Sequence, residues 1–119
     1  VMLNASVAGS KGGANSTIYG ASKAAVRSLS RTFSSAYLER NIRFNTVSPG
    51  PIDTPIWNRK GEAPSEAIIA LRKANTEANP MKRYGTPEEV AGAIAFLLSS
   101  ESTYVVGTEL FVDGGYTQL

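Results

Sequence analysis

Two residues near the start of the sequence have types and a spacing that could move a proton. Tyr19 and Lys23 are four residues apart, which puts two side chains on the same face of a helix. An ammonium group beside a phenol favours the phenolate and lowers the tyrosine pKa from its ordinary value near 10. Such a tyrosine exchanges a proton with an alcohol or a ketone near neutral pH. Taken alone, the motif also fits an exposed tyrosine beside a solvated lysine.

Ser6 adds a hydroxyl group to this pair. It precedes Tyr19 by thirteen residues and follows an apolar run, residues 1–5, that predicts a buried strand. Ligands collect at the carboxyl ends of strands in open α/β sheets. The Ser6 hydroxyl could therefore hydrogen-bond the substrate oxygen that Tyr19 protonates. The alternative is a turn serine that satisfies backbone groups.

The elements that must position these residues alternate between strand and helix, which predicts a parallel sheet with crossover helices. The clearest boundary is at Thr86, where Pro87 and Glu89 complete an N-cap and a capping box. Strands are predicted at residues 1–5, 42–47 and 108–112, and helices at 18–40, 64–78 and from the Thr86 cap to 98.

Two further patterns predict how these elements end and pack. The segment 48–51, Ser-Pro-Gly-Pro, is expected to stop the second strand, because proline removes a backbone donor. Apolar residues at three- and four-residue spacing predict the buried faces of the helices. In the first helix they are Ala21, Ala25, Leu29, Phe33 and Tyr37, and in the last helix they are Val90, Ala93, Ile94, Leu97 and Leu98.

The composition excludes several classes of protein. A chain of 119 residues that is 42% hydrophobic is long enough for one core and too short for two. It has no cysteine and no histidine, which excludes disulfides, zinc ribbons and Ser–His–Asp triads, and we expect no metal site. The net charge of +2, without a basic run, argues against nucleic acid. No apolar run approaches the roughly 20 residues that span a bilayer, so we expect a cytoplasmic protein without membrane contact.

Four segments together resemble the short-chain dehydrogenase/reductase family. The first joins Asn4-Ala5-Ser6 to the Tyr19-x-x-x-Lys23 motif, and the others are residues 45–54, 83–91 and 107–115. They cover nearly the whole chain in the family's order and spacing. The resemblance implies an NAD- or NADP-dependent oxidoreductase that interconverts a ketone and a secondary alcohol. It also implies a small carbonyl or alcohol substrate and a homo-oligomer, either a dimer or a tetramer.

The resemblance also implies a role for each matching residue. Tyr19 would be the general acid/base. Lys23 would lower the pKa of Tyr19 and hold the nicotinamide ribose, and Ser6 would orient and polarise the substrate carbonyl. Trp57 follows the nicotinamide segment and could equally be a wall of the substrate pocket or a packing anchor. The positions expected to line the nicotinamide and its phosphates are Pro49, Gly50, Ile52 and Thr54.

The family's sheet has the strand order 3-2-1-4-5-6-7, and the three strands here would be the last three. Helices would cover both faces, with the Thr86 helix reached by a left-handed crossover, against the usual right-handed rule. The family's glycine-rich phosphate loop lies upstream of the matched segments. The loop at residues 9–13 lacks both the G-x-G-x-x-G spacing and a P-loop ending, so we interpret it as a flexible loop near the substrate.

We therefore expect residues 1–119 to be the carboxy-terminal half of a single Rossmann-type oxidoreductase domain. The chain starts inside an apolar run, which suggests that it was cut from a longer one. We expect the isolated fragment to be inactive. The main alternative to the oxidoreductase function is that the chain has no catalytic role and acts only in packing and oligomerisation. A hydrolase or transferase is disfavoured. Without histidine or cysteine it would need a Ser–Lys or a carboxylate site, and the sequence offers no matching set of residues.

Overall fold

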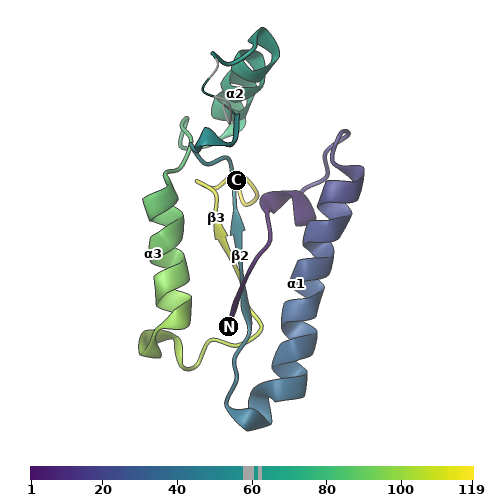
Figure 1. The fold of residues 1–119 in the computed structure, drawn as a ribbon, viewed down its shortest axis with the longest axis vertical. Helices are drawn as coiled ribbons and strands as arrows, with labels where there is room; N and C mark the ends of the chain where they lie inside the picture. The colour runs from purple at the N-terminus through teal and green to yellow at the C-terminus, as the bar shows by residue number, and fades with distance from the viewer. Residues whose placement is uncertain (58–60, 62) are drawn as a thin grey trace.

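Strands and helices alternate along the chain in the computed structural model, which describes residues 1–57, 61 and 63–119 (Figure 1). Three parallel strands form one sheet in the order β1-β2-β3, and the predicted alternation is confirmed. The elements are β1 (Met2–Asn4), α1 (Thr17–Tyr37), β2 (Asn45–Pro49), α2 (Glu66–Ala78), α3 (Pro87–Leu98) and β3 (Glu109–Val112). Single 3₁₀ turns occupy Val7–Gly9, Leu38–Arg40, Pro55–Trp57 and Ser100–Ser102.

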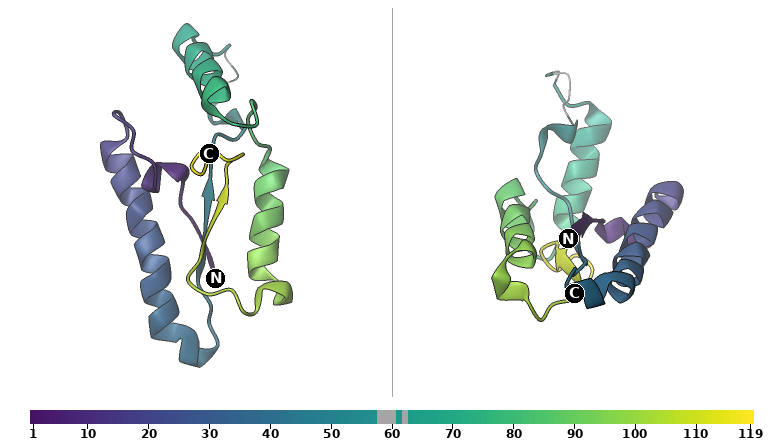
Figure 2. Two further views of the ribbon diagram at one scale, coloured as in Figure 1. Left: turned by 180° about the vertical axis from the view of Figure 1, so that it is seen from behind. Right: turned by 60° about the horizontal axis from the view of Figure 1, so that its bottom comes forward.

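The sheet lies between two helices, with α1 on one face and α3 on the other (Figures 1 and 2). The strand order shows that both connections advance across the sheet in the same direction. Connections that advance in one direction over opposite faces have opposite hands. With α1 following the right-handed rule, the connection through α3 is left-handed. The expected position of the Thr86 helix is therefore confirmed.

The second strand ends at Pro49, so the prediction that the prolines stop it earlier is wrong. The peptide groups of a strand point alternately to its two neighbours. On the β1 side, the carbonyl of Val47 accepts from the amide of Ala5 at 2.8 Å. On the β3 side, the amide of Gly50 donates to the carbonyl of Val112 at 3.0 Å. Pro49 therefore lacks its donor only toward β1, where pairing ends, and the ladder to β3 continues.

The buried residues of α1 are polar, which corrects most of the predicted apolar face, although Phe33 does pack against Phe44 with ring centres 5.4 Å apart. Ser30 and Ser34 are buried, and the Ser34 hydroxyl donates to the carbonyl of Phe44 at 2.8 Å. Leu29 remains 45% exposed. The predicted residues Ala21, Ala25 and Tyr37 are also exposed, and Phe33 is half-buried. Hydrophobic periodicity identifies an apolar face of a helix but not the surface against which that face packs.

Few apolar side chains are fully buried among the residues whose burial is described: Ala5, Val47 and Leu97. Leu97 comes from the predicted face of α3, but the predicted burial of Leu98 is wrong, because its side chain is 57% exposed. Most of the buried polar side chains bond to the backbone or to another side chain, whereas the buried hydroxyls of Ser30 and Thr46 have no hydrogen-bond partner among the described residues. The Asn45 amide, for example, donates to the carbonyl of Val105 at 2.9 Å. Polar contacts therefore hold much of this interior together.

The predicted capping box at the start of α3 is confirmed. The Thr86 hydroxyl accepts from the Glu89 amide at 3.3 Å, and the Glu89 carboxylate accepts from the Thr86 amide at 2.8 Å. Arg83 donates to the same carboxylate, at 2.6 Å for the shorter bond. The Arg83 hydrogen bond, followed by that of the Thr86 amide, lowers the pKa of Glu89 to about 2.

Across the described residues, no helix combines the length and the apolar character needed to cross a membrane.

Candidate active site

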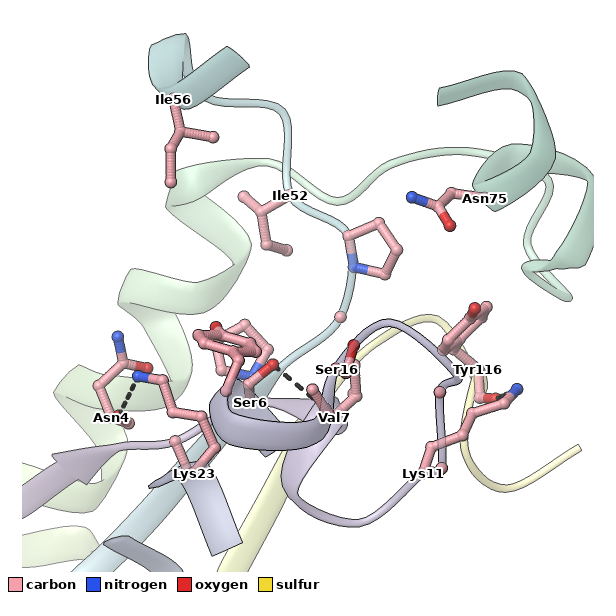
Figure 3. Close-up of a pocket in the computed structure, with 18 of the residues that line it drawn as sticks. Asn4, Ser6, Val7, Lys11, Ser16, Lys23, Ile52, Ile56, Asn75 and Tyr116 are labelled. Atoms are coloured by element: carbon pink, nitrogen blue, oxygen red, sulfur yellow. Dashed lines mark hydrogen bonds between the residues drawn. The ribbon is translucent and has the colours of Figure 1, made fainter. Parts of the chain in front are cut away.

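A cavity of about 710 Å³ lies at the carboxyl ends of the strands (Figure 3). Its lining comes from the end of β1, from the segments that follow β1, β2 and β3, from the first turns of α1 and from α2. Parallel strands bring their carboxyl ends to one edge of the sheet, where ligands bind in open α/β folds. The predicted catalytic residues Ser6, Tyr19 and Lys23 all line this cavity.

Ser6 follows β1 in an extended conformation and caps the 3₁₀ turn at Val7–Gly9. Its Oγ accepts from the amide of Ala8 at 3.2 Å, as the turn interpretation of this serine predicts. A hydroxyl group both accepts and donates. The bond to Ala8 uses an acceptor position, so the Ser6 proton remains able to bond an oxygen in the cavity.

Two glycines let this turn approach α1 closely. A Cβ atom added to Gly9 would lie 2.8 Å from the backbone nitrogen of Ala24. A Cβ atom added to Gly20 would lie 2.8 Å from the carbonyl oxygen of Ala8. Both distances are too short for a real carbon contact. The glycines therefore allow the backbone around Ser6 to sit directly against the helix that carries the tyrosine and the lysine.

Tyr19 and Lys23 lie one turn apart in α1. The Nζ of Lys23 is 5.7 Å from the centre of the Tyr19 ring and donates to the carbonyl of Asn4 at 3.2 Å. This bond ties the ammonium group to the last residue of β1. The Tyr19 side chain is 53% exposed, so it has access to water. The structure thus holds a positive charge at the end of β1 and near the Tyr19 ring.

The residues expected to hold a nicotinamide fall into two groups. Pro49, Gly50 and Ile52 line the cavity, whereas Thr54 does not. A Cβ atom on Gly50 would lie 2.8 Å from the Cα of Asp113, so glycine is needed where the ends of β2 and β3 meet. The side chain of Trp57, which could equally line the substrate pocket or anchor the packing, is not among the described side chains.

The cavity also contains residues that the sequence did not single out, chiefly Lys11, Asn75 and Tyr116. The Nζ of Lys11 donates to the carbonyl of Tyr116 at 2.9 Å and lies 3.9 Å from the centre of its ring. Tyr116 comes shortly after β3, so the rule that ligands collect after parallel strands could have identified it. Asn75 lies within α2, where no local signal marks it.

Comparison with known proteins covers nearly the whole chain. Residues 1–117 match the family model described as "Enoyl-(Acyl carrier protein) reductase". The "3beta-hydroxysteroid dehydrogenase 1" of Eggerthella lenta is 46% identical over 99 residues, which are 83% of this chain and 36% of that protein. The "3-oxoacyl-[acyl-carrier-protein] reductase FabG" of Thermotoga maritima is 41% identical over 110 residues, 92% of this chain and 42% of that protein.

A third relative matches along the full chain. The "Oxidoreductase asL5" of Sarocladium schorii is 40% identical over 119 residues, 100% of this chain and 45% of that protein. The chain thus spans less than half the length of each of these three relatives, and it matches their carboxy-terminal part. The family match and the identities agree with the arrangement of strands and helices described above. The chain belongs to the short-chain dehydrogenase/reductase family.

Proposed function

We propose that residues 1–119 form the carboxy-terminal half of an oxidoreductase domain that interconverts a ketone and a secondary alcohol with NAD or NADP. The observation that carries the proposal is that Ser6, Tyr19 and Lys23, from two separate elements, line one cavity at the carboxyl edge of the sheet. Membership of the family supports it, as do relatives whose names describe dehydrogenases and reductases.

In the direction of reduction, Tyr19 donates its phenolic proton to the carbonyl oxygen as a hydride adds to the carbonyl carbon. Ser6 donates a hydrogen bond to the same oxygen and so stabilises the charge that develops there. The ammonium group of Lys23 lies 5.7 Å from the ring centre, and its charge would stabilise the phenolate left behind. Because Tyr19 is half exposed, water can return the proton.

The residues beside the cavity fit the nicotinamide end of such a cofactor. Pro49 and Ile52 offer an apolar wall for a flat ring. An ammonium group has three N–H donors, and Lys23 uses one on the carbonyl of Asn4, which leaves donors for ribose hydroxyls. When bound, the nicotinamide supplies the hydride, and the protein supplies position and electrostatics.

Exposed apolar residues of α1, such as Leu29 and Tyr37, support the further proposal that the whole protein is a homo-oligomer, either a dimer or a tetramer. These exposed residues, together with the small number of buried apolar ones, also favour the competing hypothesis that the chain is only a packing unit. The intact mass of the sample distinguishes a packing unit from a whole enzyme, for which we expect about double the mass of this chain. A sample near 12.6 kDa whose melting temperature does not respond to either nucleotide would favour the packing unit.

The test is the Tyr19→Phe variant of the full-length protein that contains this chain, assayed with NADH and NADPH against a panel of ketones. We expect turnover to fall by about 100-fold or more, because the variant lacks the acidic proton. Nucleotide affinity should change by less than about threefold, since phenylalanine keeps the ring. Tyr37→Phe, in the same helix but outside the cavity, is the matched control and should retain activity. Near-normal turnover of Tyr19→Phe would defeat the proposal.

A further inference from the structure

We propose that Lys11 binds an anionic group of the substrate, so that the enzyme prefers ketones and alcohols that carry a carboxylate or a phosphate. The inference rests on the proposed oxidoreductase function and names the substrate class for the same cavity. It also assigns a role to the loop at residues 9–13, whose glycine-rich sequence does not fit a phosphate loop.

The charge of the cavity is the first observation. Among the described residues that line it, the charged side chains are Lys11 and Lys23, and none is acidic. Apolar side chains such as Ile52, Ile56 and Leu71 form other parts of the wall. Two positive charges beside apolar walls create a positive potential that attracts anions. In the proposed reaction, Lys23 acts beside Tyr19, whereas Lys11 has no role in the proton transfer. Lys11 is therefore free to bind another part of the substrate.

The second observation is that the Lys11 side chain is held in place. Its ammonium group donates to the carbonyl of Tyr116 and lies over the ring of the same residue. These contacts fix a long side chain that would otherwise lose entropy on binding a ligand. One of its three donors is used, and no carboxylate among the described residues forms an ion pair with it. The remaining donors can bond the oxygens of a ligand.

The third observation is the position of Lys11 relative to the catalytic residues. In the close-up, Lys11 and Tyr116 lie on one side of the cavity, Asn4 and Lys23 lie on the other, and Ser6 lies between them (Figure 3). A substrate whose carbonyl oxygen meets Ser6, and whose remaining structure runs toward Lys11, would bring its far end to the Lys11 ammonium group. An anionic group at that end would form a charge-assisted hydrogen bond, which is stronger than one between neutral groups.

The test compares matched substrates in the full-length protein. One pair is a keto acid and its amide, and the other is a phosphorylated ketone and the same ketone without phosphate. We expect the wild type to prefer the anionic member of at least one pair by about 10- to 100-fold in kcat/KM. The pair that shows the preference identifies the anion.

Three variants connect this preference to the lysine. Lys11→Met and Lys11→Gln should abolish it, mainly through a higher KM for the anionic substrate, and Lys11→Arg should retain most of it. Nucleotide affinity, measured separately, should be unchanged in all three. Lys11 is replaced by one apolar and one polar residue, so that a folding defect in one variant does not decide the result. A changed melting temperature would reveal such a defect.

The failures are distinguishable. If the wild type turns over neutral and anionic ketones equally well, the role of Lys11 is wrong and the oxidoreductase proposal stands. If Lys11→Met weakens nucleotide binding in proportion to its loss of activity, the lysine serves the cofactor and the inference is also wrong. If the wild type reduces none of these four ketones and none of the ketone panel used to test Tyr19→Phe, both proposals fail.

Discussion

The guanidinium Nε of Arg27 lies 2.5 Å from Oε2 of Glu109 and joins α1 to β3. The other carboxylate oxygen accepts from the hydroxyl of Ser48 at 2.7 Å and from that of Ser10 at 3.2 Å. The Glu109 side chain is only 10% exposed, so solvent screens these contacts weakly. One carboxylate thus connects the helix that carries Tyr19, the loop that follows β1 and the second strand.

Removing that charge should destabilise the full-length protein. Glu109→Gln removes the mostly buried charge that pairs with Arg27, whose own side chain is 38% exposed, and we expect a loss of about 1–3 kcal/mol in the free energy of unfolding. Urea denaturation measures the change. Glu77→Gln, which breaks an exposed ion pair to Lys73, is the control and should cost less than about 0.5 kcal/mol. Equal losses in the two variants would show that the Glu109 network does not hold these elements together.

A methyl group at Gly9 should disturb the contact between the 3₁₀ turn and α1. Gly9→Ala would bring a carbon to 2.8 Å from the backbone of Lys23 and Ala24, so one of the two segments must move. Overpacking of this kind costs about 1–3 kcal/mol. Turnover should also fall, because the displaced turn carries Ser6.

Gly12→Ala is the control for this prediction, because no atom lies within 4 Å of the added methyl group. Its stability should stay within about 0.5 kcal/mol of the wild type. Chemical denaturation and steady-state kinetics on the two variants check both effects. If Gly9→Ala were as stable and as active as Gly12→Ala, the close approach would have no importance for the site.

The Glu89 carboxylate predicts a pH dependence of stability. Its pKa in the folded protein is about 2, below the ordinary value of 4.5, because Arg83 and the Thr86 amide bond to the charged form. A lowered pKa favours folding at pH values above the unfolded pKa. That stabilisation is lost as the pH falls from about 4.5 through about 2.

Glu89→Gln isolates this effect, because glutamine keeps a capping-box acceptor but carries no charge. The melting temperature of the wild type should exceed that of the variant by a constant amount above about pH 5. The difference should shrink toward pH 2. A difference that stays constant between pH 7 and pH 2.5 would contradict the assigned cause.

The parts of the fold that follow local rules could be predicted from the sequence. The capping box of Thr86 and Glu89 depends on three-residue spacing alone, and the structure contains it. The four-residue spacing of Tyr19 and Lys23 likewise placed them one helical turn apart. The motif spacing also identified a family whose sheet order and helix positions agree with the fold.

Contacts between distant segments could not be predicted in this way. Lys11 and Tyr116 are 105 residues apart, and nothing in either neighbourhood indicates the other. The predicted burial of Leu29 in α1 is wrong, because its periodic spacing marks an apolar face but carries no information about the packing partner. Pro49 was taken as a strand breaker, since the sequence does not tell on which side of the strand its missing donor lies.

Ser6 and Tyr19 line one cavity, and we propose that both bond the same substrate oxygen there. A crystal structure of the full-length protein with its nucleotide and an unreactive substrate analogue tests it most directly. We predict an analogue oxygen within about 2.6–3.2 Å of both the Ser6 Oγ and the Tyr19 Oη. Side-chain oxygens that point into separate spaces, with no ligand oxygen between them, would contradict the account.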